Sequence, residues 1–84
     1  MSEMQREKLY VPVVVRFDTE GNLRPLTIEF DEEHKYSVDS VLDVCRAACQ
    51  TVGGVGVRYT IRVQGHKRYL WLEKGKWFVI TTSQ

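Results

Sequence analysis

The chain has 84 residues, of which 43% are hydrophobic and 27% are charged. These proportions are typical of globular proteins and exclude disordered, coiled-coil and collagen-like chains, while the length leaves room for only one core. The 12 basic and 11 acidic residues nearly cancel, which excludes nucleic-acid binding by bulk electrostatics, so any basic site must be local. We expect a flexible N-terminus at residues 1–8 and a single β domain at residues 9–82.

The N-terminal part predicts a β-hairpin. The odd positions of residues 9–17 are all apolar, which is typical of a strand, and Pro12 places that strand at a sheet edge or at a bulge. Residues 18–22 have the acidic and Gly/Asn composition of a hairpin loop, and residues 23–30 alternate again. A second polar turn at residues 31–34 follows.

Residues 37–50 fit two structures. A helix is favoured by six apolar residues at helical spacing and by Gly53, which is available to end it: Val38, Val41, Leu42, Cys45, Ala48 and Cys49. An extended structure is equally acceptable, because a short run rich in valine is poorly discriminated by periodicity. These residues alone leave a strand and a helix near residues 40–50 as equal alternatives.

Three glycines among residues 51–56 form a connector. A phosphate-binding loop would require a GxxxxGKS/T motif, or GxGxxG between a strand and a helix, and neither is present. We expect instead a flexible or bulged start to the next strand.

The last third of the chain predicts a three-stranded antiparallel meander. Strands at residues 57–64, 67–73 and 76–81 are separated by the glycine turns Gly65-His66 and Lys74-Gly75. Two-residue loops at these turns predict the following cross-strand pairs: Arg62 with Tyr69, Thr60 with Trp71, Arg58 with Glu73, Trp71 with Phe78, and Tyr69 with Ile80.

This meander has two apolar faces. One is an ordinary core face, and the other carries four apolar residues rimmed by three basic ones: Tyr69, Trp71, Phe78 and Ile80, with Arg58, Arg62 and Lys67. The second face fits a core covered by another element, a symmetric dimer interface, or a surface on which the bases of single-stranded nucleic acid stack. We rank the covered core first because contiguous exposed apolar patches are uncommon on monomers.

Neither catalysis nor metal binding is indicated. The chain has no GxSxG, HExxH or Cys-His-Asp/Asn pattern, and a domain of this size rarely supplies a pocket of the ~300–1,000 Å³ that small-molecule sites use. Cys45 and Cys49 have neither the spacing of a zinc knuckle nor that of a disulfide framework, and His34 and His66 do not complete a ligand set. We expect reduced cysteines, no enzymatic activity, no metal and no cofactor.

Four segments carry a resemblance to known proteins. Between Val11 and Val79 the chain resembles a group of short uncharacterised proteins of Clostridia-like Firmicutes, through residues 24–28, 41–44, 53–60 and 76–79. It is similar, more distantly, to small β-barrel domains of unknown function that accompany bacterial translesion-polymerase genes, which share an Arg-Pro strand, a Tyr-x-Val strand and a Trp-bearing final hairpin. The resemblance implies an SH3-like barrel, implies extended rather than helical structure at residues 38–48, and brings no catalytic residue.

We therefore predict a mainly β domain, a small antiparallel SH3-like barrel of five or six strands, with an α+β form containing a helix near residues 40–50 as the alternative. The expected function is non-enzymatic binding in protein–protein interaction or homodimerisation, with nucleic-acid binding as the alternative. We expect a cytoplasmic location and no membrane contact, since no run approaches the ~20 apolar residues that span a bilayer. The candidate binding residues are Arg58, Arg62, Lys67, Tyr69, Trp71 and Phe78.

Overall fold

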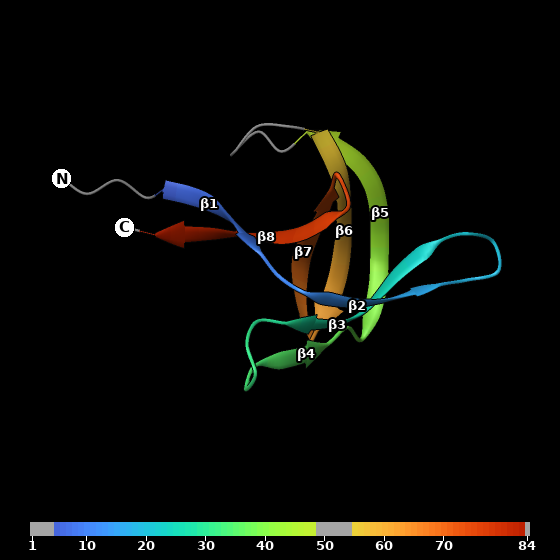
Figure 1. Ribbon diagram of the computed structural model, residues 1–84, viewed down its shortest axis with the longest axis horizontal. Helices are drawn as coiled ribbons and strands as arrows, with labels where there is room; N and C mark the ends of the chain where they lie inside the picture. The colour runs from blue at the N-terminus through green and yellow to red at the C-terminus, as the bar shows by residue number, and fades with distance from the viewer. Residues whose placement is uncertain (1–4, 49–54, 84) are drawn as a thin grey trace.

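A computed structural model describes residues 5–48 and 55–83, which form eight β-strands in two antiparallel sheets (Figure 1). The strands are β1 (Gln5–Tyr10), β2 (Val13–Phe17), β3 (Leu23–Glu29), β4 (Lys35–Ser37), β5 (Ser40–Ala48), β6 (Val55–Val63), β7 (His66–Glu73) and β8 (Lys76–Ser83). The five-stranded sheet has the order β1-β8-β7-β6-β5 and the three-stranded sheet the order β2-β3-β4. Within the described residues there is no helix, hence none that could cross a membrane, and the strands do not close into a barrel. The prediction of a mainly β protein is confirmed.

The first predicted strand is divided between the two sheets. β1 begins at Gln5, before the start that we expected at Leu9, and β2 begins after Val11 and Pro12. The Val11 amide donates a hydrogen bond of 3.0 Å to the Trp77 carbonyl, whereas the Pro12 carbonyl accepts one of 2.9 Å from the Glu29 amide. Pro12, which has no amide proton, thus stands at the crossing from one sheet to the other.

The two predicted polar turns are present, on either side of β3. In the β2–β3 loop, Asp18 Oδ1 accepts hydrogen bonds of 2.9 Å from the amides of both Glu20 and Asn22. The bond from the Asn22 amide is the main cause of the lowered pKa of Asp18. In the turn at residues 31–34, Asp31 Oδ1 likewise accepts hydrogen bonds of 2.8 Å from the amides of Glu33 and His34. Each loop is therefore closed by its own first carboxylate.

The ambiguous segment is a strand. β5 pairs with the outer edge of β6 from Ser40 to Ala48, with an irregularity in register between Val41 and Asp43. A helix would leave this edge of β6 without backbone partners, so sheet pairing decides what local periodicity left open. The helical alternative is wrong for the described residues; positions 49–54, which include the end of that helix and most of the glycine connector, lie outside them.

The turn between β6 and β7 lies one residue earlier than predicted. Gln64 and Gly65 occupy its two central positions with φ of 52° and 79°, the type I′ geometry that needs positive φ at both. The pairs are therefore Arg62 with Lys67, Thr60 with Tyr69 and Arg58 with Trp71, and the three predicted pairs across this turn were wrong. The error is two residues in register, so each side chain keeps its predicted face.

An apolar core lies between the two sheets, and a second apolar cluster lies on the outer face of the larger sheet. The second cluster consists of Trp71, Phe78 and the partly buried Ile80. The core between the sheets is formed by Val11, Ile28, Tyr59, Ile61 and Leu70, with further valines packed against them.

Gly56 is needed where β6 approaches β7. A Cβ at this position would lie 2.8 Å from the Leu72 carbonyl oxygen, a backbone atom held in the sheet. We expect Gly56→Ala to lower the free energy of unfolding by roughly 1–3 kcal/mol in urea denaturation. Gly21→Asn is the matched control, because Gly21 has a φ of 86° that Asn tolerates and a Cβ there would meet no atom within 4 Å beyond its chain neighbours. This variant should lose less than about 1 kcal/mol of the free energy of unfolding. Equal losses in both variants would contradict a steric role for Gly56.

Candidate functional site

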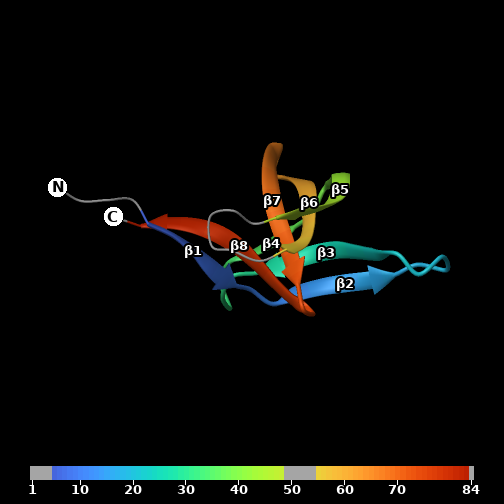
Figure 2. The same ribbon diagram turned by 90° about the horizontal axis from the view of Figure 1, so that it is seen from above.

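β7 and β8 separate soon after the turn that joins them. Their ladder consists of Glu73–Lys76, Leu72–Trp77 and Trp71–Phe78, which confirms the predicted Trp71–Phe78 pair, but the predicted Tyr69–Ile80 pair does not form. Beyond Phe78, β8 follows β1, while the first half of β7 pairs only with β6 (Figures 1 and 2). We call the gap between residues 66–70 of β7 and 79–83 of β8 the β7–β8 seam. No strand of the described chain fills it.

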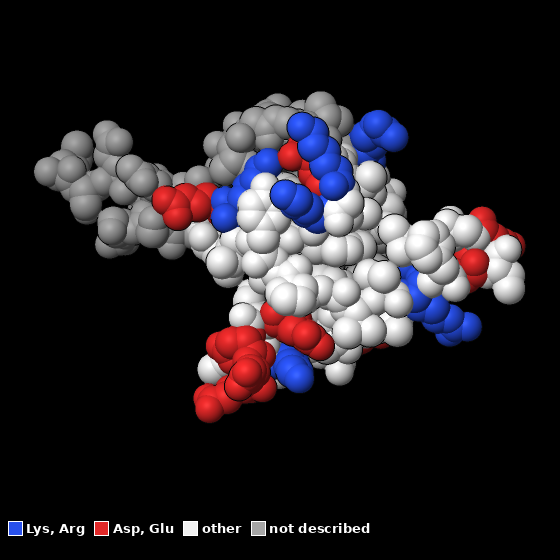
Figure 3. Space-filling view, viewed as in Figure 1, with Lys and Arg blue, Asp and Glu red and all other residues white. Residues whose placement is uncertain are grey.

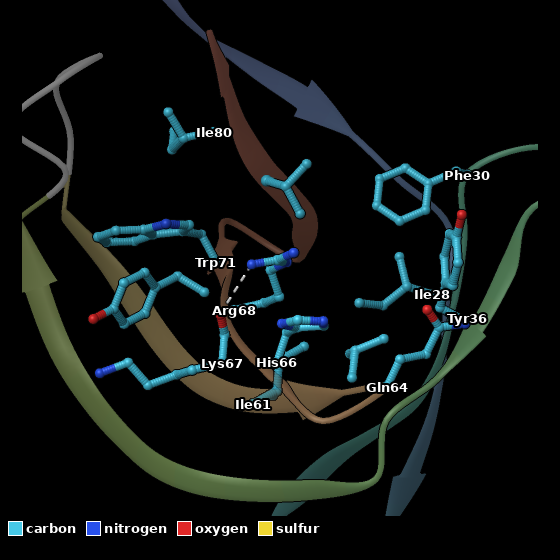
Figure 4. A pocket seen from close by; sticks show the side chains of 13 residues that line it. Ile28, Phe30, Tyr36, Ile61, Gln64, His66, Lys67, Arg68, Trp71 and Ile80 are labelled. Carbon is cyan, nitrogen blue, oxygen red and sulfur yellow. Dashed lines mark hydrogen bonds between the residues drawn. The ribbon is translucent and has the colours of Figure 1, made fainter.

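The backbone groups that face this seam follow from the register. Val63 and His66 close the two-residue turn, so they form a hydrogen-bonded pair, and such pairs alternate along an antiparallel ladder. The amides and carbonyls of Lys67 and Tyr69 therefore point away from β6 and into the seam. The Arg68 guanidinium donates a hydrogen bond of 3.3 Å to the Lys67 carbonyl oxygen, the dashed line in Figure 4.

A cavity of about 700 Å³ opens along the seam. Figure 4 shows Ile28, Phe30 and Tyr36 on one side of it and Trp71 on the other. The rings of Phe30 and Tyr36 meet edge to face, with centroids 5.5 Å apart. The expectation that so small a domain lacks a pocket of this size was wrong, because two sheets joined without a closed ladder leave space between them.

The charged residues that line the cavity, Lys67 and Arg68, are both basic. His66 is a further polar lining residue, and no Asp or Glu lines the cavity among the residues that the structure describes. On the face shown in Figure 3, acidic side chains form one group on the turn before β4 and another at the tip of the β2–β3 hairpin, and further ones lie beside Lys and Arg side chains. The cavity thus combines apolar lining residues with the positive charges of Lys67 and Arg68.

Two of the predicted site residues are core residues. Trp71 is 9% exposed and Phe78 only 1%, and their rings stack with centroids 6.2 Å apart and 9° between their planes. Tyr10 of β1 meets Phe78 edge to face at 5.6 Å, and the Lys8 ammonium lies 4.8 Å from the Phe78 ring centroid. The cover for this face therefore includes β1, from the segment expected to be flexible, and not a helix.

The other predicted site residues form a basic group around Tyr69. The Tyr69 side chain is 45% exposed, with the Arg58 guanidinium 4.9 Å and the Lys67 ammonium 5.8 Å from its ring centroid. Arg62 stands directly opposite Lys67 across β6 and β7. The structure thus brings Arg58, Arg62, Lys67 and Tyr69 together on one face, beside the seam.

Sequence reasoning missed Phe30, Tyr36, His66 and Arg68 as site residues. Phe30 and Tyr36 flank the polar turn of residues 31–34, and nothing in their spacing indicates that they face β7. His66 and Arg68 were interpreted as parts of a turn and a core strand. These residues line a cavity only because β7 and β8 separate beyond the Trp71–Phe78 pair.

The described residues contain no group of three or more His, Cys, Asp or Glu side chains that could hold a metal ion. Cys45 is free, and the side chain of Cys49 lies outside the described residues. Neither family models, curated proteins nor solved structures match this chain.

Proposed function

We propose that this chain is a non-enzymatic protein-interaction module that binds an extended segment of a partner protein in the β7–β8 seam. One observation supports this function above all: an unpaired main-chain edge of β7 lies beside an apolar cavity of about 700 Å³. An added strand gains affinity from main-chain hydrogen bonds and specificity from pockets that take every second side chain. The seam offers both elements in one place.

The main-chain part of the binding would fall on Lys67 and Tyr69. The amides and carbonyls of Lys67 and Tyr69 that point away from β6 are two residues apart, which is the repeat of an antiparallel ladder. A strand lying beside β7 can therefore pair with them without any rearrangement of β6. The Lys67 carbonyl already accepts a bond from Arg68, yet a carbonyl oxygen has two lone pairs and can accept a second donor.

We also infer that the two sheets are an SH3-like barrel left open at the seam. The chain bends from sheet to sheet at Val11-Pro12 and again at Val38-Asp39, where the Val38 amide donates to Leu26 and the Asp39 amide to Arg62, both at 2.8 Å. Two such corners are what a small barrel of bent strands needs. A partner strand in the seam would complete the ring.

The nucleic-acid alternative receives less support from the geometry. Stacking of successive bases needs several exposed rings, whereas of the three aromatic residues predicted for the site Trp71 and Phe78 are buried and Tyr69 alone is exposed. Two basic residues already lie close to that ring. The basic group remains an anion-binding surface, but not a platform for a row of bases.

A neutral peptide that alternates Val and Thr over about eight residues, blocked at both ends, tests strand addition. We expect the amides of Lys67 and Tyr69 to show the largest chemical-shift changes and new protection from hydrogen exchange, with a Kd on the order of 10–100 µM. The same peptide with Pro at alternate positions is the control, because it lacks the donors of one edge.

Two outcomes would overturn the proposal. The first is an absence of shift changes at millimolar peptide. The second is full protection of the Lys67 and Tyr69 amides without peptide, in a protein with the mass of a dimer, which would assign the seam to homodimerisation.

A further inference from the structure

Arg62 and Lys67 place like charges in direct opposition. They are a non-hydrogen-bonded pair of the β6–β7 ladder, in which Cβ atoms lie about 4.5–5.5 Å apart and like charges destabilise the sheet. Both side chains are exposed, and neither forms an ion pair with a carboxylate of the described chain. This arrangement has a cost in the free protein that an external anion would remove.

A second pair of opposed basic residues, on the other sheet, has a carboxylate close to it. Arg16 and Arg24 also stand opposite each other, in β2 and β3, but there the carboxylate of Asp18 lies close enough to Arg16 to have its own pKa lowered by that charge, among larger causes. Arg62 and Lys67 form no ion pair with a carboxylate among the described residues, although the Asp39 carboxylate lies at the same turn, where its Oδ2 accepts a hydrogen bond of 3.4 Å from the Gly65 amide. The Arg16–Arg24 pair provides a matched control.

Arg58 adds a third cation to this face of β6 and β7. Its guanidinium lies against the Tyr69 ring, and its buried Nε has no hydrogen-bond partner among the described residues. Arg58, Arg62 and Lys67 lie on the outer face of β6 and β7, and of these three Lys67 also lines the cavity. The inner part of the cavity is lined by apolar side chains together with His66 and Arg68. A strand in the seam would present alternate side chains to these two environments.

Resting on the proposed function, we propose that the strand accepted by this chain alternates apolar and acidic residues. The apolar side chains enter the cavity near Ile28, Ile61 and Val79. The carboxylates point outward, over Lys67 and Arg62. A carboxylate peptide fits this site better than a polyphosphate chain, because nucleic acid has no apolar side chains with which to fill the inner half.

Three probe peptides of about eight residues distinguish strand addition itself from the preference for an acidic strand. One alternates Val and Glu, one alternates Val and Thr, and one alternates Val and Lys. By fluorescence anisotropy at about 50 mM salt, we expect the Glu peptide to bind about tenfold more tightly than the Thr peptide and the Lys peptide more weakly than either. At about 300 mM salt this advantage should shrink severalfold, because screening weakens exposed charge pairs.

The double variant Arg62→Gln with Lys67→Gln should remove the preference for Glu over Thr while leaving the affinity for the Thr peptide within about twofold. The double variant Arg16→Gln with Arg24→Gln removes the same two charges from the other sheet and should keep the preference. This pair of variants separates a local site from an effect of net charge.

Each remaining outcome has a definite meaning. Equal affinities for the Glu and Thr peptides would overturn the acidic alternation but leave strand addition intact. Binding of neither peptide would overturn the proposed function and this inference together. Binding of oligothymidylate that depends on Arg62 and Lys67, without binding of the Glu peptide, would assign the basic face to nucleic acid.

Discussion

Phe78→Ala should lower the free energy of unfolding by about 3–5 kcal/mol, the largest loss that we expect from a single substitution in this chain. Phe78 is 1% exposed and packs between Trp71 and Tyr10, which belong to different neighbouring strands. Truncation removes a large apolar surface and leaves a cavity that three paired strands cannot close without shifting. Urea denaturation followed by tryptophan fluorescence measures the loss.

Tyr69→Ala is the matched control for Phe78→Ala, because both rings lie on the same face of the five-stranded sheet. Tyr69 is 45% exposed, so its truncation should cost less than about 1.5 kcal/mol. A Phe78→Ala protein with nearly unchanged stability but lost peptide binding would contradict the core assignment and make Phe78 a binding residue.

Tyr69→Pro should abolish binding of the alternating peptides, with a loss of affinity of at least about 30-fold. The Tyr69 amide points into the seam, because Tyr69 and Thr60 are a non-hydrogen-bonded pair of the β6–β7 ladder. Proline therefore removes a donor that β6 does not use, and its ring occupies the place of the incoming strand. The fold should survive a change that blocks only this edge.

The comparison with Tyr69→Ala separates the backbone from the ring. Tyr69→Ala keeps the amide and should retain binding within about fivefold, as anisotropy would show. Circular dichroism checks that Tyr69→Pro is folded, and a probe peptide N-methylated at alternate residues tests the same hydrogen bonds on the unaltered protein. Equal binding by the proline and alanine variants, together with full binding of the methylated peptide, would rule out strand addition.

Much of the fold could be predicted because it depends on local chemistry. Alternation with a period of two, together with the glycine turns, located β2, β3, β6, β7 and β8, and Asp18 and Asp31 marked the loops that they close. The register of β6 and β7 was missed by two residues because His66 was placed in the turn. Glycine in the second position of a type I′ turn, as at Lys74-Gly75, would have placed it correctly.

The seam could not be predicted, because it depends on where β8 leaves β7. β8 lies between β1 and β7, so its pairing with β1 uses one edge, while on the other edge the pairing with β7 stops after Trp71–Phe78. Alternation gives the face of each side chain but not the length of a ladder, so β8 was expected to continue along β7 as far as Tyr69–Ile80. The cavity and the roles of Phe30 and Tyr36 follow from this early separation.

The hydrogen bond from Arg68 to the Lys67 carbonyl has a consequence for copies of the molecule that meet one another. An unpaired strand edge is a template for edge-to-edge aggregation, and proteins protect such edges with long cationic side chains. Here the guanidinium lies across the open edge itself, at 3.3 Å from its carbonyl oxygen. Another copy that paired through this edge would bring its own Lys67 and Arg68 close to these charges, so the like charges that border the cavity also discourage the chain from polymerising through it.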